Sequence, residues 1–367
     1  MKSSERNQIS RLPLLDGLRG YAAIIVILYH CILCLDPTIL HRLQGTAIFS
    51  IASNYDRFIK LLLVAFNGNA AVILFFVLSG VVLTISVFNS RHDFIISTCA
   101  AFAIKRILRL YPPMFVCIIF TYVIVFATFA FYKIPYSQFY FTNKNLLNNI
   151  FLVSPEVAAH TWTIFLEIAV IPLIVLLCLI SLKHSTYWLI VFLALSLIIS
   201  VTRPSLLSYG NFSVYFFSFV LGIAIGVFYI RNLVIHVPIN STILLVSFFA
   251  IELFGTFLII QMIIASILVY KIIFSQDALG SLLSAKLSLY FGRISYGLYL
   301  WHYVFTIIAY TIIAIHFPGA LGDYKALYGL STFPVVLLIT VILAHWSEEL
   351  IERPLIRLGY RATKHLP

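Results

Sequence analysis

The sequence predicts an all-α polytopic integral membrane protein with about ten transmembrane helices and both termini in the cytoplasm. Of its 367 residues, 62% are hydrophobic and only 10% are charged, whereas soluble globular chains carry about 25% charged residues. So few polar side chains cannot cover a water-soluble fold of this size. The composition therefore excludes a soluble enzyme, a disordered chain and a secreted disulfide scaffold.

Apolar runs of transmembrane length recur along the chain. A helix needs about 20 apolar residues to cross the hydrocarbon core of a bilayer. Pro112 and Pro113 are expected at the end of a span, Pro172 is expected to kink one, and Gly255 alone separates the seventh run from the eighth. No polar stretch is long enough for a separate soluble domain, so we expect one membrane-embedded domain over residues 1–367. The ten runs are 20–35, 64–88, 112–132, 163–182, 186–202, 212–230, 237–253, 256–274, 294–316 and 331–350.

The Lys and Arg residues predict the orientation. With a cytoplasmic N-terminus, 17 of the 24 Lys and Arg residues fall on the cytoplasmic side. Cytoplasmic loops of membrane proteins carry such an excess, so both termini are predicted to be cytoplasmic. The formal net charge of +11 therefore reflects membrane orientation rather than nucleic-acid binding. The seven on the other side are Arg42, Arg57, Lys60, Lys133, Lys144, Arg203 and Lys325.

The first span contains two ionisable residues on one helical face. Arg19 and His30 are eleven residues apart in LLDGLRGYAAIIVILYH, which returns to nearly the same face about 16 Å further along the helix. Asp16, one turn before Arg19, is a candidate to orient its guanidinium group. An ionisable residue within a span indicates a functional site. The alternative is that Arg19 snorkels to the cytoplasmic interface and His30 caps the far end of the helix.

Basic residues precede the third span in AIKRILRLYPP. Arg106 and Arg109 lie at positions i and i+3 and so face the same way. Two guanidinium groups at the mouth of a membrane protein suit a phosphorylated ligand, although taken alone they are more typical of ordinary positive-inside anchors. The segment FFVLSG adds the Ser79 hydroxyl late in the second span, where close helix packing is the alternative explanation.

Polar residues also enter the fourth and ninth spans. In HTWTIFLE, His160 and Glu167 are seven residues apart on nearly the same face, and a buried glutamate is costly unless it is paired or protonated. A structural ion pair with an arginine is the alternative to a functional role. In SYGLYLWH, Tyr299 lies one turn before His302, and an interfacial aromatic packing face is the alternative there.

Together and in this order, these motifs resemble those of the membrane acyltransferase family 3, which includes bacterial O-acetyltransferases of surface polysaccharides. The resemblance covers residues 14–358 and comprises LDGLRG with an R-x10-H helix, FFxLSG, RxxR before YP, W-x4-E, SYxLYLWH and IERP. The chain departs from the family in the fourth span, where WTIFLEIAV replaces the usual WSLSxE. It is also expected to be a stand-alone domain without the C-terminal esterase-like domain of many relatives.

The resemblance implies transfer of an acyl group, most often acetyl, from cytoplasmic acyl-coenzyme A to a hydroxyl of a cell-envelope glycan or lipid-linked sugar across the bacterial inner membrane. No metal is expected, since no compact ligand pattern occurs. A multi-span transporter or flippase of a lipid-linked sugar is the alternative function. The residues matched to the chemistry are His30, Arg19, Glu167 and Asp16; those matched to the donor are Arg106, Arg109, Arg19 and Ser79; those matched to the acceptor are His160, Trp162, Tyr299 and His302.

Overall fold

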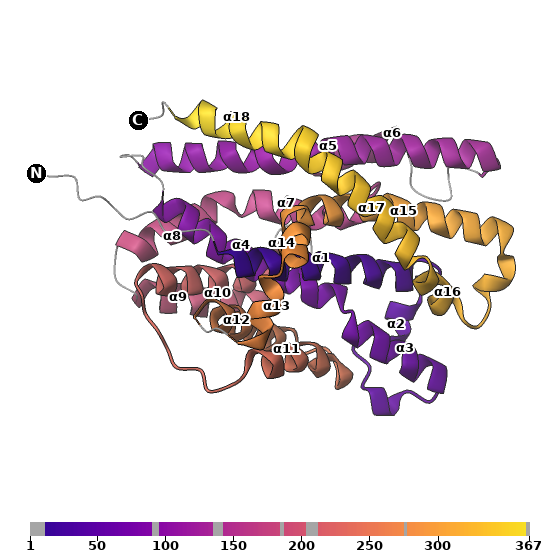
Figure 1. The fold of residues 1–367 in the computed structure, drawn as a ribbon, viewed down its shortest axis with the longest axis horizontal. Coiled ribbons are helices and arrows are strands. Elements are labelled where there is room, and N and C mark those ends of the chain that lie inside the picture. Colours follow the sequence, from indigo (N-terminus) through magenta and orange to yellow (C-terminus); the bar gives the residue numbers. More distant parts are fainter. Residues whose placement is uncertain are drawn as a thin grey trace, which may run out of the picture.

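The computed structural model describes residues 12–89, 95–134, 142–183, 187–202, 212–274 and 277–364. Within these ranges the chain is helical and contains no strand. The long helices run side by side, and the start of α1 and the end of α18 lie toward the same end of the bundle (Figure 1). The helices are α1 (Pro13–Leu33), α2 (Ile39–Leu43), α3 (Asn54–Ala65), α4 (Gly68–Phe88), α5 (Ile95–Tyr132), α6 (Asn143–Ile150), α7 (Trp162–Ala169), α8 (Ile171–Lys183), α9 (Tyr187–Thr202), α10 (Phe212–Ile230), α11 (Ser241–Ala250), α12 (Leu258–Phe274), α13 (Ala278–Leu283), α14 (Lys286–Arg293), α15 (Ser295–His316), α16 (Lys325–Ser331), α17 (Phe333–Ser347) and α18 (Arg353–Thr363), with 3-10 turns η1 (Ile48–Ser50), η3 (Ala159–Thr161), η4 (Ile251–Leu253) and η5 (Pro318–Leu321) and a π-helix η6 (Glu348–Glu352).

The helices confirm an all-helical membrane protein but not the count of ten spans. In the described chain, six helical segments are long and apolar enough to cross a membrane, and the bent pair α7–α8 makes a seventh. The three remaining apolar helices are α9, α11 with η4, and α12. The longest of these, α12, has 17 residues and extends about 25 Å, less than the thickness of about 30 Å of the hydrocarbon core.

The third predicted span is part of a much longer helix. Helix α5 has 38 residues and continues through Pro112 and Pro113, which were expected at a helix end. At 1.5 Å per residue the helix is about 57 Å long, so it exceeds the hydrocarbon thickness by nearly a factor of two. The prolines fall where the apolar run begins, inside the helix rather than at its boundary. Arg106 and Arg109 lie on the turns just before them.

Two expected breaks in the helices are confirmed. Helices α7 and α8 meet at Val170 with a bend of 41°, and Pro172 follows as the second residue of α8. Proline has no N–H to donate into the preceding turn, which accounts for the break at this point. Gly255 has a φ of +138° between η4 and α12. A conformation with positive φ suits glycine, so this residue separates the seventh and eighth apolar runs.

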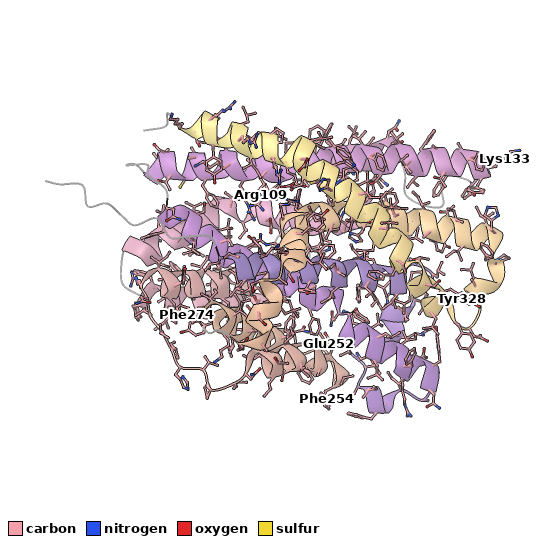
Figure 2. All side chains as sticks on the ribbon, viewed as in Figure 1. Arg109, Lys133, Glu252, Phe254, Phe274 and Tyr328 are labelled. Carbon is pink, nitrogen blue, oxygen red and sulfur yellow. The ribbon has the colours of Figure 1, made fainter. Side chains whose placement is uncertain are left out.

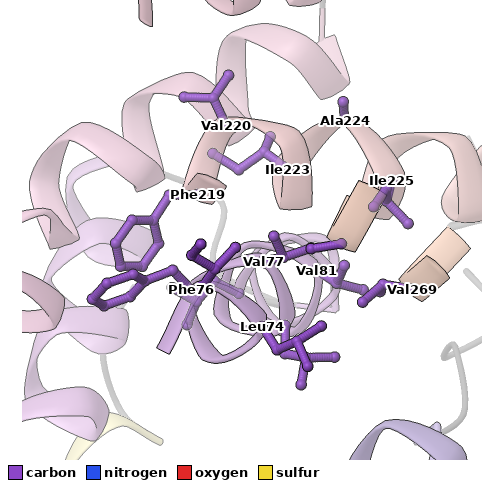
Figure 3. Close-up of a cluster of buried hydrophobic side chains, with 14 of the residues drawn as sticks. Leu74, Phe76, Val77, Val81, Phe219, Val220, Ile223, Ala224, Ile225 and Val269 are labelled. Carbon is purple, nitrogen blue, oxygen red and sulfur yellow. The ribbon is translucent and has the colours of Figure 1, made fainter. Parts of the chain in front are cut away.

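The largest apolar core joins α4 to α10. Phe76 packs on Phe219 with ring centroids 4.7 Å apart, and Val77 and Val81 lie on the side of α4 that faces α10 (Figure 3). The two helices approach so closely because Gly80 and Gly222 meet at the crossing. A Cβ atom at Gly80 would overlap the backbone of α10, as is typical where small residues mediate helix packing in membranes.

The glycines of LDGLRG give α1 its central position. A Cβ at Gly17 would overlap the carbonyl of Leu283, and one at Gly20 would lie 2.6 Å from the backbone nitrogen of Gly292. Helix α1 therefore contacts α13 and α14 directly through its backbone, while its other faces pack on α4 and α15. This packing holds Arg19 and His30 on a helix that is enclosed from several sides.

Candidate active site

A cavity of about 80 Å³ lies between α1, α4, α5, α7 and α15. A cavity needs about 10–15 Å³ to hold one water molecule, so this one has room for several waters or for a small acyl group. One part of its wall is apolar, and the other carries three arginines, a glutamate and several hydroxyl groups. The lining residues are Arg19, Val72, Phe75, Phe76, Ser79, Val82, Arg106, Arg109, Leu110, Thr163, Ile164, Glu167, Ser295, Tyr296 and Tyr299.

Glu167 is paired from two neighbouring helices. Arg106 of α5 donates to one carboxylate oxygen at 2.8 Å, and the Ser79 hydroxyl of α4 donates to the other at 2.8 Å. The side chains of Arg106 and Glu167 are only 11% and 17% exposed. The expected partnering of this glutamate is therefore present as an ion pair with an arginine, and the pair ties α7 to α4 and α5.

The cavity wall carries more positive than negative charge. Three guanidinium groups and one carboxylate line it, and Arg19 also contacts Asp16 on its own helix at 3.3 Å, as predicted. Arg109 lies between α5 and the rest of the bundle (Figure 2). The Nε atoms of Arg106 and Arg109 are buried and have no hydrogen-bond partner within the described chain. Such donors carry a free-energy cost that an anionic ligand would remove.

Three histidines, from α1, η3 and α15, lie close together. The ring of His302 lies 4.9 Å from that of His30 and 5.3 Å from that of His160, measured between centroids. The Nδ1 atom of His30 is 2.9 Å from the carbonyl oxygen of Val26. Because a carbonyl can only accept, the Nδ1 of a neutral His30 carries the proton, and its Nε2 is left as a proton acceptor.

The histidine cluster is rich in polar atoms without partners. His160 is 3% exposed and His302 is fully buried. Both ring nitrogens of His160 and the Nε2 of His302 are unpaired among the described residues. The ring of Tyr303 is tilted against that of His160, with centroids 5.0 Å apart, and is edge-on to that of His30 at 6.1 Å. Buried polar groups are normally hydrogen-bonded, so these nitrogens have hydrogen-bonding capacity that a polar ligand would use.

Tyr299 separates the cavity from the histidine cluster. Its ring lines the cavity and lies 5.5 Å from His160 and 5.9 Å from His302. Its hydroxyl donates to the backbone carbonyl of His160 at 2.8 Å and accepts from Thr163, also at 2.8 Å. The predicted donor residues Arg19, Ser79, Arg106 and Arg109 thus line the cavity. The predicted acceptor residues His160 and His302 lie on the other side of Tyr299.

Two predicted site residues make contacts that the sequence did not predict. Trp162 is not part of the cavity lining, because its ring packs against Tyr215 at 5.5 Å and Phe76 at 6.2 Å. Glu167 was expected to position the sugar or His30, whereas its carboxylate is bound by Arg106 and Ser79. Both differences arise because packing between helices distant in sequence decides which side chains meet.

Four residues of the site were not assigned a role from the sequence: Thr163, Ser295 and Tyr296 on the cavity wall, and Tyr303 beside the histidines. A signal for the tyrosines was present. Tyr296, Tyr299 and Tyr303 are spaced i, i+3 and i+7 and therefore share one helical face. In the described residues, no group of three or more His, Cys, Asp or Glu side chains is arranged to hold a metal ion.

Comparison with known families places the chain in one of them. A family model described as an acyltransferase domain matches residues 12–346. The chain belongs to acyltransferase family 3. The match extends over nearly the whole chain and confirms the predicted membership. No curated protein and no solved structure matches the chain. As a member of acyltransferase family 3 with several apolar membrane-length helices, the protein is a multi-pass membrane acyltransferase.

Proposed function

We propose that the protein transfers an acyl group, most often acetyl, from cytoplasmic acyl-coenzyme A to a hydroxyl of a cell-envelope glycan or lipid-linked sugar on the other side of the bacterial inner membrane. The observation that carries the proposal is the arrangement on either side of Tyr299. An arginine-lined cavity lies on one side of this residue, and a cluster of histidines with unpaired nitrogens lies on the other.

The arginines suit the donor. Coenzyme A carries several phosphate charges, and guanidinium groups bind phosphate through paired hydrogen bonds. Arg109 has a buried Nε without a partner among the described residues and is the strongest candidate for this contact. Arg106 shares its charge with Glu167, and Arg19 lines the same wall. The acyl end of the donor would then extend toward Tyr299 along the apolar part of the cavity.

His30 is the proposed general base. Its free Nε2 would take the proton from the acceptor hydroxyl while that oxygen attacks the thioester carbonyl. The bond from carbon to sulfur then breaks, and the thiolate of coenzyme A receives the proton. Arg19 lies about 16 Å from His30 along α1, too far to reach the same carbonyl, so it is assigned to holding the donor. An acyl-histidine intermediate is the other path for His30.

The histidine cluster suits the acceptor. Sugar hydroxyls both donate and accept hydrogen bonds, and a neutral imidazole offers one nitrogen of each kind. The unpaired nitrogens of His160 and His302 would bind hydroxyls beside the one that reacts. The Tyr303 ring, which faces His160, supplies an apolar surface of the sort that packs against the C–H face of a sugar ring.

Labelled acetyl-coenzyme A and extracted cell-envelope glycan test the proposal. Wild type should transfer label to glycan, and His30→Gln should lower turnover by about 100-fold or more, the usual scale of general acid–base catalysis. Coenzyme A affinity should not change, because His30 is not part of the donor cavity. His316→Gln, at the exposed end of α15, is the matched control and should retain full turnover.

The same assay distinguishes the alternatives. Label that accumulates on the protein without acceptor, and vanishes in His30→Gln, would indicate an acyl-histidine. Absence of protein-bound label would favour direct transfer. Near-normal turnover of His30→Gln at equal expression would refute the catalytic assignment. A wild-type protein that binds no acyl-coenzyme A and labels no glycan would instead support a transporter or flippase.

A further inference from the structure

A second cavity lies at the opposite end of α1 from Pro13. It has about 30 Å³ of space and is bounded by the end of α1, by α2 and the residue after it, by α3, by the start of α4 and by η4. It shares no lining residue with the arginine-lined cavity. Its lining residues are Tyr29, Leu40, Leu43, Gln44, Lys60, Leu63, Val64, Asn67, Asn69 and Glu252.

This small cavity contains buried groups of opposite charge. Lys60 is 3% exposed and Glu252 is 8% exposed, yet no ion pair among the described residues joins them. Lys60 donates instead to the backbone carbonyl of Leu43 at 3.1 Å. Taking a lysine and a glutamate out of water costs several kcal/mol per group unless hydrogen bonds compensate. A polar ligand in the cavity between Lys60 and Glu252 would offset this desolvation cost by hydrogen-bonding to both groups.

The lining defines the chemistry of that ligand. Lys60 supplies donors and Glu252 supplies acceptors. The Oδ1 of the buried Asn67 accepts from the Ala70 N–H at 3.0 Å, so the Asn67 amide adds N–H donors. Gln44 is exposed, so the cavity reaches the surface at that residue. The space accepts about two water-sized groups, which matches a pair of hydroxyls on a larger molecule. The aromatic ring of Tyr29 adds an apolar wall.

Tyr29 also connects this cavity to the histidine cluster. Its ring lies edge-on to that of His30 with centroids 5.7 Å apart. Helix α3 and η4, which carry Lys60 and Glu252, are in contact, and Gly68 at the start of α4 packs directly on the Tyr29 ring. The cavity is therefore fixed next to the end of α1 where the proposed acceptor reacts.

We propose that the Lys60–Glu252 cavity is a second sugar subsite, which binds hydroxyls of the residue next to the sugar that is acylated. The inference rests on the proposed function, in which a glycan reacts at His30. It predicts that the enzyme prefers an acceptor of at least two sugars. A single sugar would occupy the histidine cluster alone and gain nothing from Lys60 or Glu252.

Binding and kinetics of Glu252→Gln and Lys60→Met test the subsite. We expect each to weaken binding of an envelope oligosaccharide, measured by titration without donor, by roughly 10- to 150-fold, the value of a hydrogen bond to a charged group. The KM for a monosaccharide acceptor and the KM for acetyl-coenzyme A should not change. Lys144→Met, at an exposed lysine of α6, is the matched control and should bind the oligosaccharide like wild type.

The possible outcomes separate this proposal from the proposed function. Three results would overturn the subsite. Glu252→Gln could bind the oligosaccharide as tightly as wild type does, or wild type could fail to bind it. The variant could also raise the KM equally for the monosaccharide and the oligosaccharide. Loss of oligosaccharide binding in a protein that transfers no acyl group would uphold the subsite and refute the acyltransferase chemistry. If Glu252→Gln does not fold, Asn69→Ala at the half-buried edge of the cavity should weaken binding in the same selective way.

Discussion

Removal of the Glu167 carboxylate should destabilise the protein strongly. Glu167→Ala leaves the Arg106 guanidinium and the Ser79 hydroxyl without the acceptor that each contacts at 2.8 Å. A hydrogen bond to a charged group contributes about 1.5–3 kcal/mol, and breaking a buried ion pair costs about 3–5 kcal/mol. Because both charged side chains are more than four-fifths buried, water compensates little of this loss. We expect Glu167→Ala to lower the free energy of unfolding by about 3–5 kcal/mol.

A double-mutant cycle measures the pair itself. Arg106→Ala, Glu167→Ala and the combined variant would be unfolded with denaturant in detergent micelles. The combined variant should be more stable than the two single losses predict, since it leaves no unpaired buried charge. Glu167→Gln, which keeps one acceptor and offers a donor to Ser79, is the matched control and should lose less than Glu167→Ala. Losses that add within about 0.5 kcal/mol would show that the two groups are not coupled and would refute the reasoning.

Three further outcomes are expected. Arg109→Ala should weaken coenzyme A binding by roughly 10- to 150-fold, and the protein should keep its helical content. Arg109→Lys should restore only part of the coenzyme A affinity. Unchanged affinity in Arg109→Ala would make Arg109 an ordinary membrane anchor. Gly80→Ala, whose Cβ would overlap α10, should lower stability by about 1–3 kcal/mol, whereas Gly319→Ala, with no atom within 4 Å of the new Cβ, should be neutral in the same melt. A membrane-impermeant thiol reagent should label Arg57→Cys in intact cells, and it should label Lys286→Cys only after the cells are permeabilised. The reverse pattern would invert the predicted orientation.

Features that depend on one helix were predictable from the sequence. Arg19 and His30 share a face because α1 is a regular helix from Pro13 to Leu33, and Asp16 lies within reach of Arg19 because it is one turn away. The break near Pro172 follows from the missing N–H of proline. These results need only helical geometry and local hydrogen bonding, which the residues themselves determine.

Contacts between helices were not predictable in the same way. The sequence indicates only that Glu167 needs a partner, not that the partner is Arg106, which is 61 residues earlier. From the sequence, Lys60 was only one of the basic residues that predict the orientation of the chain. Its burial beside Glu252 depends on how α3 packs on η4. The count of ten spans was not confirmed either. An apolar run in the sequence does not show where its helix begins and ends, and in α9 and α12 the helix is shorter than a membrane span.

The position of Tyr299 has a consequence for the energetics of the cell. A continuous chain of hydrogen-bonded groups through a membrane protein conducts protons and would dissipate a proton gradient across the membrane. The only hydroxyl proton of Tyr299 is given to the carbonyl of His160, which has no proton to pass on, and its ring is 8% exposed. Tyr299 is therefore a barrier to proton conduction between the cavity and the histidines, because its hydroxyl proton is held by an acceptor that cannot pass it on.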